Sequence, residues 1–241
     1  MQLYLIRHAQ SENNALWEYS GSNLGRNMDP ELTMLGRQQA EALARYLASD
    51  QANPETTDDP QNRSGFGLTH LYCSLMVRAV ATGAVIARRL NIPLLGWPDW
   101  HEGGGIYLED EGSGELVGYP GKDHTWFQDN YPELSLPPGV GDSGWWNRPF
   151  EERPQRWERA RRVINELNLR HANDSHRVAI VTHGGFYNYF MKTLLDLDFS
   201  KEVWFVFNNA AITRIDFTDQ ELRLVYQNRL DYLPDELLSA G

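Results

Sequence analysis

The sequence predicts an α/β protein in which a mostly parallel central sheet is covered by helices on both faces. Two observations lead to this prediction. Short apolar runs alternate along the chain with segments whose apolar residues recur at helical spacing. In addition, the runs at residues 3–6 and 178–182 are apolar throughout, as strands buried on both faces are. Apolar residues make up 41% of the 241 residues, which is enough for a sizeable core.

The expected elements follow the chain in order. Strands are expected at residues 3–6, 68–73, 92–95 and 178–182, with a closing hairpin at 211–217 and 222–227. Helices are expected at residues 33–47, 77–90, 151–171 and 186–195. Thr33 is a suitable N-cap for the first of these helices. Residues 50–67 should form an exposed loop because polar residues and proline dominate there, and the apolar run 203–207 could form an edge strand used for self-association.

Residues 103–149 are rich in Gly, Pro and Trp and show no regular period. We therefore expect a folded insertion or lid within a single domain that spans residues 1–241. The tryptophans in and near this segment are Trp97, Trp100, Trp126, Trp145 and Trp146. We expect them to form a small separate core that packs the insertion onto the sheet. The alternative is a lid that presents aromatic rings to a ligand, with specificity set first by Lys122, His124 and Arg148.

The overall charge and the cysteine content narrow the possible partners. The formal net charge of −11 argues against nucleic acid or an anionic membrane as a partner, because both would be repelled. Cys73 is the single cysteine, so no intramolecular disulfide can form, which fits a reducing compartment. No apolar stretch approaches the roughly 20 residues that span a bilayer, and the first residues lack a signal-peptide pattern. We therefore expect a cytoplasmic protein.

Histidines stand directly after two of the predicted strands. His8 lies just beyond the strand at residues 3–6, and His183 lies just beyond the strand at 178–182. Because ligands bind beyond the carboxyl ends of parallel strands, we expect both imidazoles at one rim of the sheet. Gly184 lets the backbone come close there, and the helix that follows would aim its first N–H groups at an anion.

Two arginines are expected at the same rim. Arg7 precedes His8, and Arg78 lies at a third junction between a strand and a helix. A guanidinium stays charged and its planar fork matches the oxygens of a phosphate group. Two arginines and two histidines therefore predict an anion pocket with an imidazole able to act as a nucleophile, which suits phosphoryl transfer.

Four segments, in this order, carry a family pattern. They are Leu-Ile-Arg-His-Ala-Gln-Ser-Glu-Asn-Asn at residues 5–14, Asp-Pro-Glu-Leu-Thr at 29–33 followed by Gly36, Gln39 and Ala40, the segment 74–82, and Val-Thr-His-Gly-Gly at 181–185. Together these segments resemble the histidine phosphatase superfamily, which includes the cofactor-dependent phosphoglycerate mutases. The resemblance implies a phosphoglycerate mutase-like fold.

The resemblance also implies a role for each residue that matches the pattern. His8 would be the nucleophile that becomes phosphorylated, giving a phosphohistidine intermediate. Arg7, Arg78 and the catalytic His183 would bind the transferred phosphoryl group, and Asn14 would add a hydrogen bond. A nucleophilic imidazole must be neutral, and the neighbouring positive charges favour that state.

The proton donor is harder to place. Glu102 is similar in position to the family's acid, which protonates the leaving oxygen and later deprotonates the attacking water. Asp99, Glu109 and Glu151 are rival carboxylates for the same role.

The chain departs from the family pattern at three positions. Ala9 and Gln10 stand where the family has Gly and Glu, and Leu75 stands where a proline is common. We expect these departures to change loop geometry only, provided that the backbone φ of residue 9 is negative.

No cofactor and no metal are expected. The chain has no His-x-x-x-His or paired-cysteine spacing and no glycine-rich nucleotide motif. The remaining histidines are expected to be surface or structural groups: His70, His101, His124, His171 and His176.

The expected function is hydrolysis of a phosphomonoester, with a small phosphorylated molecule as the partner. One alternative is a phosphomutase of the phosphoglycerate mutase type, which would need extra basic residues to hold a second acidic group. The other is a non-catalytic protein that binds a phosphorylated ligand. The fold alone does not choose among substrates.

Overall fold

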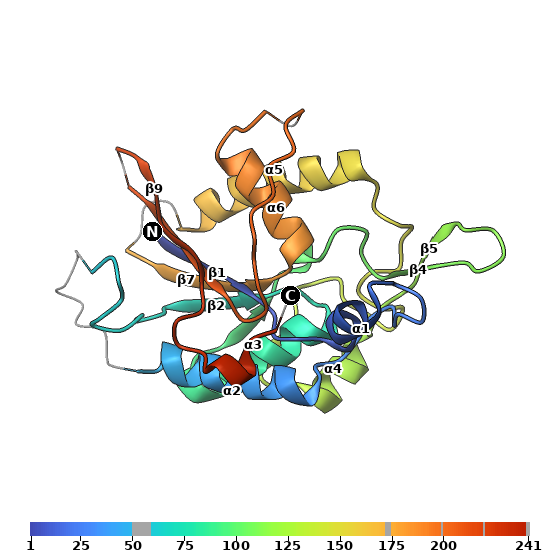
Figure 1. Ribbon diagram of the computed structural model, residues 1–241, viewed down its shortest axis with the longest axis horizontal. Coiled ribbons are helices and arrows are strands. Elements are labelled where there is room, and N and C mark those ends of the chain that lie inside the picture. Colours follow the sequence, from blue (N-terminus) through green and yellow to red (C-terminus); the bar gives the residue numbers. More distant parts are fainter. Residues whose placement is uncertain (50–58, 172–174, 199, 219, 240–241) are drawn as a thin grey trace.

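A central sheet lies between two layers of helices in the computed structural model, which describes residues 1–49, 59–171, 175–198, 200–218 and 220–239 (Figure 1). The strands of this sheet are β1 (Gln2–Arg7), β2 (His70–Cys73), β3 (Leu94–Gly96), β6 (Leu134–Ser135), β7 (Arg177–Thr182), β8 (Ile212–Phe217) and β9 (Leu222–Arg229). Their spatial order is β6-β3-β2-β7-β1-β8-β9. Neighbours from β6 to β1 are parallel, whereas β8 and β9 are antiparallel. The predicted mostly parallel α/β fold is confirmed.

The helices are divided between the two faces of the sheet. They are α1 (Glu12–Ser20), α2 (Met34–Leu47), α3 (Val77–Leu90), α4 (His124–Asn130), α5 (Arg153–His171) and α6 (Gly184–Leu194). Figure 1 shows α2 and α3 on one face and α5 and α6 on the other. None of the described helices combines the length and the hydropathy that crossing a lipid bilayer requires.

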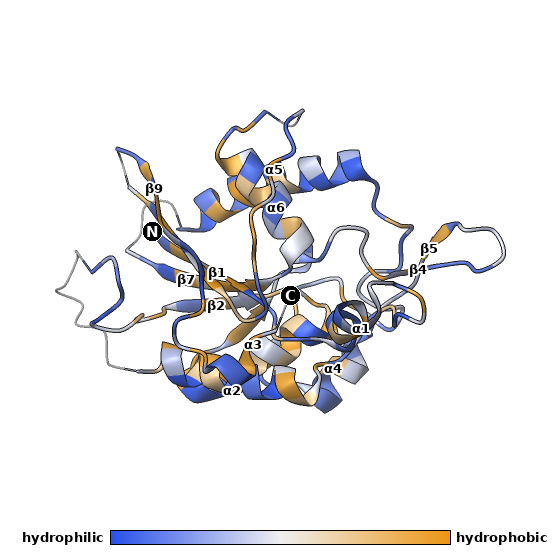
Figure 2. Ribbon diagram, viewed as in Figure 1, coloured by the Kyte–Doolittle hydropathy of each residue, from blue (hydrophilic) through white to orange (hydrophobic). Residues whose placement is uncertain are grey.

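Strand β1 shows why both faces need a helical cover. Its side chains alternate between the faces, so Tyr4 and Ile6 join the core cluster under α2 and α3, while Leu3 and Leu5 join the cluster under α5 and α6. All four side chains are fully buried. Burial of each such side chain is worth roughly 1.5–3 kcal/mol, so β1 stabilises both layers at once. Apolar residues are concentrated on the sheet between the layers (Figure 2).

The structure adds elements that the sequence pattern does not predict. Helix α1 buries no side chain, so it has no apolar period, and it is held by a capping box in which Ser11 and Asn14 exchange hydrogen bonds. The insertion is folded, with a small hairpin formed by β4 (Tyr107–Glu109) and β5 (Leu116–Gly118). Its strand β6 pairs with β3, so the insertion extends the main sheet.

The predicted tryptophan core and the predicted edge strand both need correction. The tryptophans do not form a separate core, because Trp97 and Trp100 belong to the cluster under α5 and α6, while Trp145 and Trp146 belong to the other main cluster. The segment 203–207 is irregular rather than an edge strand.

The predicted loop at 50–67 is not exposed throughout its described part. Residues 50–58 lie outside the described residues. Phe66 is buried and packs edge-on against the rings of Tyr4 and Tyr46, because this single aromatic residue can reach the core at the start of β2.

Candidate active site

Two histidines meet where neighbouring parallel strands end. Strands β1 and β7 pair in register from Gln2 to Arg7, which is opposite Thr182. His8 and His183 therefore follow the strands side by side, and their ring centroids lie 5.0 Å apart. Both side chains are buried. The predicted convergence of the two imidazoles arises directly from the register of the sheet.

The tautomer of His8 is set by two hydrogen bonds. Its Nδ1 lies 2.7 Å from the carbonyl oxygen of Ala9, which can only accept, so Nδ1 carries the proton. Its Nε2 then accepts a hydrogen bond of 3.1 Å from Nε of Arg78. Burial, and next the charges of Arg78 and Arg7, hold the pKa of His8 well below its ordinary value. The imidazole is neutral, and its Nε2 lone pair is directed at the Arg78 guanidinium.

Asp29 holds Arg78 in place and was not among the predicted site residues. Arg78 lies in the first turn of α3, whose N-terminal residue Val77 donates its backbone N–H to Oδ1 of Asp29 at 3.0 Å. The same carboxylate lies 3.9 Å from Nη1 of Arg78. Burial raises the pKa of Asp29 to about 6, although the charge of Arg78 opposes the shift.

Replacing Asp29 with asparagine should lower kcat/KM for phosphate esters by about tenfold, because Arg78 loses the charge that positions it. The wild-type pH profile should bend as the Asp29 carboxyl protonates, at a pKa of about 6, and the bend should be absent in Asp29→Asn. Glu41→Gln is the matched control, since Glu41 is exposed on α2. Steady-state kinetics between about pH 5 and pH 8 measures both effects. A bend that persists in Asp29→Asn would assign it to another group.

His183 is held by Ser74 at the end of β2. The Ser74 hydroxyl lies 2.8 Å from Nε2 of His183, and it also accepts the backbone N–H of Met76. Nδ1 of His183 is buried and has no hydrogen-bond partner among the described residues. When Ser74 donates to Nε2, the proton of neutral His183 is on Nδ1 and can be donated to an anion. Burial, followed by the charge of Arg78, keeps the pKa of His183 well below its ordinary value.

Arg7 lines the pocket beside the histidines. Its Nη1 donates a hydrogen bond of 2.5 Å to the carbonyl oxygen of Phe207, while its Nε is buried without a partner among the described residues. Burial lowers the pKa of Arg7 to about 10, which still leaves it charged near neutral pH. Arg7, Glu102 and Gly184 line a cavity of about 360 Å³. Because Arg7 has a hydrogen bond at Nη1 and none at Nε, it is suited to bind an anion.

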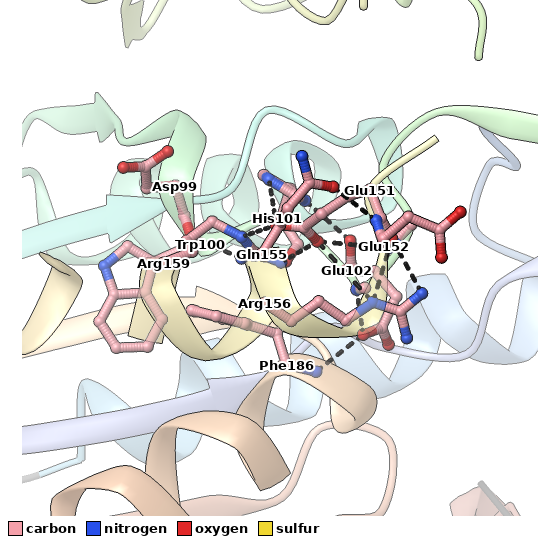
Figure 3. A network of polar contacts seen from close by, with 12 residues as sticks. Asp99, Trp100, His101, Glu102, Glu151, Glu152, Gln155, Arg156, Arg159 and Phe186 are labelled. Atoms are coloured by element: carbon pink, nitrogen blue, oxygen red, sulfur yellow. Dashed lines mark hydrogen bonds and ion pairs between the residues drawn. The ribbon is translucent and has the colours of Figure 1, made fainter. Parts of the chain in front are cut away.

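Glu102 faces the same cavity and is fixed by backbone donors. Its Oε1 accepts the N–H groups of Gly103 and Phe186, each at 2.7 Å, and its Oε2 accepts that of Gly185 at 3.0 Å. A Cβ at position 185 would lie 2.4 Å from Oε1, so only glycine allows this close approach. The carboxylate is thus bound to the N-terminus of α6 (Figure 3), the helix for which His183 is the N-cap residue.

A buried ion pair fixes the backbone that carries Glu102. Arg159 on α5 binds both carboxylate oxygens of Glu151, at 2.6 and 2.7 Å, and it donates to the carbonyl oxygens of Asp99 and His101 (Figure 3). None of the three rival carboxylates takes the position of Glu102. Glu151 is paired with Arg159, the Asp99 side chain is paired with Arg162, and Glu109 is exposed on β4.

Comparison with known proteins places these features in a family. A model of the histidine phosphatase superfamily (branch 1) matches residues 3–57 and 60–229. The chain belongs to this superfamily. Among curated proteins, none matches the chain.

Several solved structures of low sequence identity share the histidine phosphatase fold. A mycobacterial glucosyl-3-phosphoglycerate phosphatase in complex with VO3 is 21% identical, with a TM-score of 0.58 over 94% of this chain and 98% of that one. Bacillus stearothermophilus YhfR is 20% identical, with a TM-score of 0.58 over 96% and 98%. The alpha-ribazole phosphatase from Shigella flexneri is 18% identical, with a TM-score of 0.60 over 95% and 96%.

The departures from the histidine phosphatase pattern are accommodated locally. Ala9 is not among the residues with positive φ, so replacing glycine there causes no backbone strain. Gln10 accepts a hydrogen bond of 2.6 Å from the hydroxyl of Thr33 and donates to Glu18. The backbone at Gln10 is also in close contact with α2, since a Cβ on Gly36 would lie 2.0 Å from its carbonyl oxygen.

Asn14, a predicted phosphate ligand, is connected to His8 through the side chain of Asn209. Its Oδ1 accepts from the backbone and hydroxyl of Ser11 and from Nδ2 of Asn209. Asn209 also donates to the carbonyl oxygen of His8 at 3.1 Å. Asn14 therefore supports the loop that carries His8.

Arg26 is a further cation near the site that the sequence pattern does not indicate. It donates a hydrogen bond of 2.8 Å to the hydroxyl of Tyr107 on β4, and its charge contributes to the lowered pKa of Arg78. Its Nε is buried and has no hydrogen-bond partner among the described residues. No regular element predicts its position, because it lies in the irregular connection between α1 and α2.

Buried histidines should make this histidine phosphatase less stable in acid. The pKa values of His8, His101 and His183 lie well below the ordinary 6.5, chiefly because of burial, so these groups stay neutral when folded and take up protons when unfolded. The stability that these neutral histidines contribute is fully present above their pKa in the unfolded chain, and it is lost as the pH falls below that value. When the pH is lowered from about 7.5 to about 5.5, proton uptake by the unfolded chain at these three histidines lowers the free energy of unfolding by about 4 kcal/mol. Asp29 opposes this change and raises the free energy of unfolding by about 1 kcal/mol over the same pH range, because its raised pKa of about 6 favours proton uptake by the folded state.

Urea denaturation at these two pH values should therefore show a net loss of about 3 kcal/mol. His8→Gln removes one of the three groups, so the loss of unfolding free energy in this variant should be smaller by roughly 1 kcal/mol. An unchanged pH dependence in His8→Gln would mean that this imidazole titrates normally in the folded chain.

Proposed function

We propose that this chain is a phosphomonoester hydrolase that acts through a phosphohistidine intermediate on His8, with a small phosphate ester as substrate. One observation carries the proposal: a neutral His8 whose Nε2 is the hydrogen-bond acceptor of Arg78. This arrangement presents a nucleophilic lone pair beside a cation suited to a phosphate oxygen.

In the first step the Nε2 lone pair of His8 attacks phosphorus, and the bond from phosphorus to the ester oxygen breaks. Arg78 exchanges its hydrogen bond to Nε2 for one to a phosphoryl oxygen, and Arg7 and Nδ1–H of His183 neutralise the remaining oxygens. Glu102, in its protonated form, gives its proton to the departing oxygen, so an alcohol leaves. The loss of the attacking lone pair is balanced by a cationic imidazole that keeps its Nδ1 proton on the carbonyl of Ala9.

In the second step water attacks the phosphorus of the phosphohistidine. The Glu102 carboxylate takes the proton of the water, and the bond from phosphorus to Nε2 breaks. Inorganic phosphate leaves and His8 returns to its neutral form. The carboxylate is positioned for this step by the N–H groups of Gly185 and Phe186.

The surroundings of the pocket support a small anionic substrate. Asn188 and Trp204 line both the active-site cavity and a neighbouring cavity of about 420 Å³. The neighbouring cavity also carries Arg153, Lys192 and Lys201, which supply positive charge on a chain of negative net charge. The names of the glucosyl-3-phosphoglycerate and alpha-ribazole phosphatases are consistent with small phosphate esters as the class to test first.

Lys122 and Arg148 are less favoured as specificity residues than the sequence suggested. Lys122 lies over the ring of Trp126, and Arg148 lies over the ring of Trp146. Their charges are thus held against the insertion.

Product analysis tests the proposed reaction against its two alternatives. The chain should release inorganic phosphate from p-nitrophenyl phosphate and from members of a panel of sugar phosphates and phosphoacids. Isomerisation of 3-phosphoglycerate with a bisphosphate primer, without phosphate release, would instead establish a phosphomutase. Tight binding of phosphate with no turnover of any ester would establish a binding protein. We further propose that the reaction needs no cofactor and takes place in the cytoplasm.

A further inference from the structure

We infer that His70, His171 and His176 form a binding site for a divalent transition-metal ion of the zinc type. Each residue offers one ring nitrogen, and the three nitrogens lie within 4.8 Å of one another. The site is independent of the proposed hydrolase reaction and was not predicted, since the sequence pattern indicated surface or structural roles for these histidines.

The three rings converge at one point. The Nδ1 atoms of His171 and His176 face each other at 2.8 Å, and the ring centroid of His70 lies 4.8 Å from that of His171 and 4.3 Å from that of His176. Tetrahedral zinc with bonds of about 2.0–2.1 Å to nitrogen separates its ligand nitrogens by roughly 3.3 Å. The pair of Nδ1 atoms would open by about half an ångström, and a small rotation of the half-buried His70 would bring in the third nitrogen.

Two hydroxyl groups orient the rings from outside. The Tyr72 hydroxyl lies 3.2 Å from Nε2 of His171, and the Thr69 hydroxyl lies 2.9 Å from Nδ1 of His70. Metal-binding histidines usually use the second ring nitrogen in such a contact, which fixes the ring and its tautomer. His171 is buried, so its orientation is fixed most firmly.

The donor set selects the kind of ion. Imidazole nitrogens suit zinc, cobalt, nickel and copper, whereas magnesium and calcium prefer oxygen ligands. Three protein ligands leave a fourth position for water, on the side where His70 and His176 are partly exposed.

The site lies at the end of the sheet opposite the candidate active site. His176 precedes β7 and His183 follows it, so the two histidines are separated by the length of the strand, about 20 Å. His70 begins β2, and His171 ends α5. An ion here would tie three elements together and stabilise the fold, without entering phosphoryl transfer.

Metal titration of the untagged, chelator-treated chain tests the inference. Zn²⁺ should bind with one high-affinity site per chain, and Co²⁺ should give the visible absorption of a low-coordinate nitrogen site. At about 100 times its dissociation constant, Zn²⁺ should raise Tm by about 5–10 °C. Mg²⁺ and Ca²⁺ should do neither.

Variants locate the ion. His70→Asn and His176→Asn, both at half-buried positions, should each weaken Zn²⁺ binding at least tenfold and abolish the rise in Tm. His124→Asn, a matched change on α4, and His8→Asn, a change in the active site, should both retain binding. Absence of binding in the wild type would overturn the inference and leave a hydrogen-bonded cluster. Binding that is lost in His8→Asn but kept in His70→Asn would also overturn it, because the ion would then be at the active site.

Discussion

Replacing His8 with glutamine is expected to lower kcat for phosphate esters by on the order of 10⁴-fold or more, which corresponds to about 5.5 kcal/mol of activation free energy. The physical reason is that an amide cannot take the phosphoryl group onto a nitrogen lone pair, while the arginines around it remain. Wild-type chain quenched during turnover of labelled substrate should carry an acid-labile, alkali-stable label on His8, and His8→Gln should carry none.

The control for this prediction must separate lost chemistry from lost folding. His8→Gln should retain its affinity for inorganic phosphate within about tenfold, because Arg7, Arg78 and His183 are unchanged. Label on another residue, or full turnover by His8→Gln, would refute the assignment of the nucleophile.

Replacing Glu102 with glutamine is expected to lower kcat by about 10²–10⁴-fold on alkyl phosphates, which is the usual contribution of a positioned acid or base. The effect on phosphorylation should be much smaller with p-nitrophenyl phosphate, whose leaving group needs no proton. Glutamine keeps an oxygen that accepts the N–H groups of Gly185 and Phe186, so the local geometry should survive.

Pre-steady-state kinetics distinguishes the two roles of Glu102. With p-nitrophenyl phosphate, Glu102→Gln should show a burst of nitrophenol followed by slow turnover, because water attack still needs the carboxylate. Glu151→Gln is the matched comparison: it should lose stability through the buried Arg159 while still showing dependence on the leaving group typical of the wild type. Equal losses on both substrates, without a burst, would exclude Glu102 as the acid.

The fold was predictable because its strands and helices carry strong patterns. The strand at 3–6 and the helix at 77–90 are apolar in the periods that their burial requires, and α3 has the predicted bounds. Helix α1 was not predicted, because its stability comes from a cap and not from an apolar face. The edge strand β6 was not predicted, because two residues are too few to show a period.

The site was predictable only where side chains follow regular elements. The two histidines stand at strand ends, so topology brings them together. Asp29 comes from an irregular segment and reaches the site through the backbone N–H of Val77 and the guanidinium of Arg78, both at the start of α3. Ser74 and Asn209 act on the histidines through contacts between segments distant in the chain, which no local pattern records.

The two walls of the active-site cavity differ in construction. One wall is the N-terminus of α6, whose amide groups bind Glu102, so this wall cannot move without displacing the Glu102 carboxylate. The other wall is the irregular segment 204–208, in which Trp204 and Val206 are exposed. If the proposed function holds, redesign toward bulkier ligands should therefore vary the side chains of this second wall, where changes in size leave the hydrogen bonds of Glu102 intact.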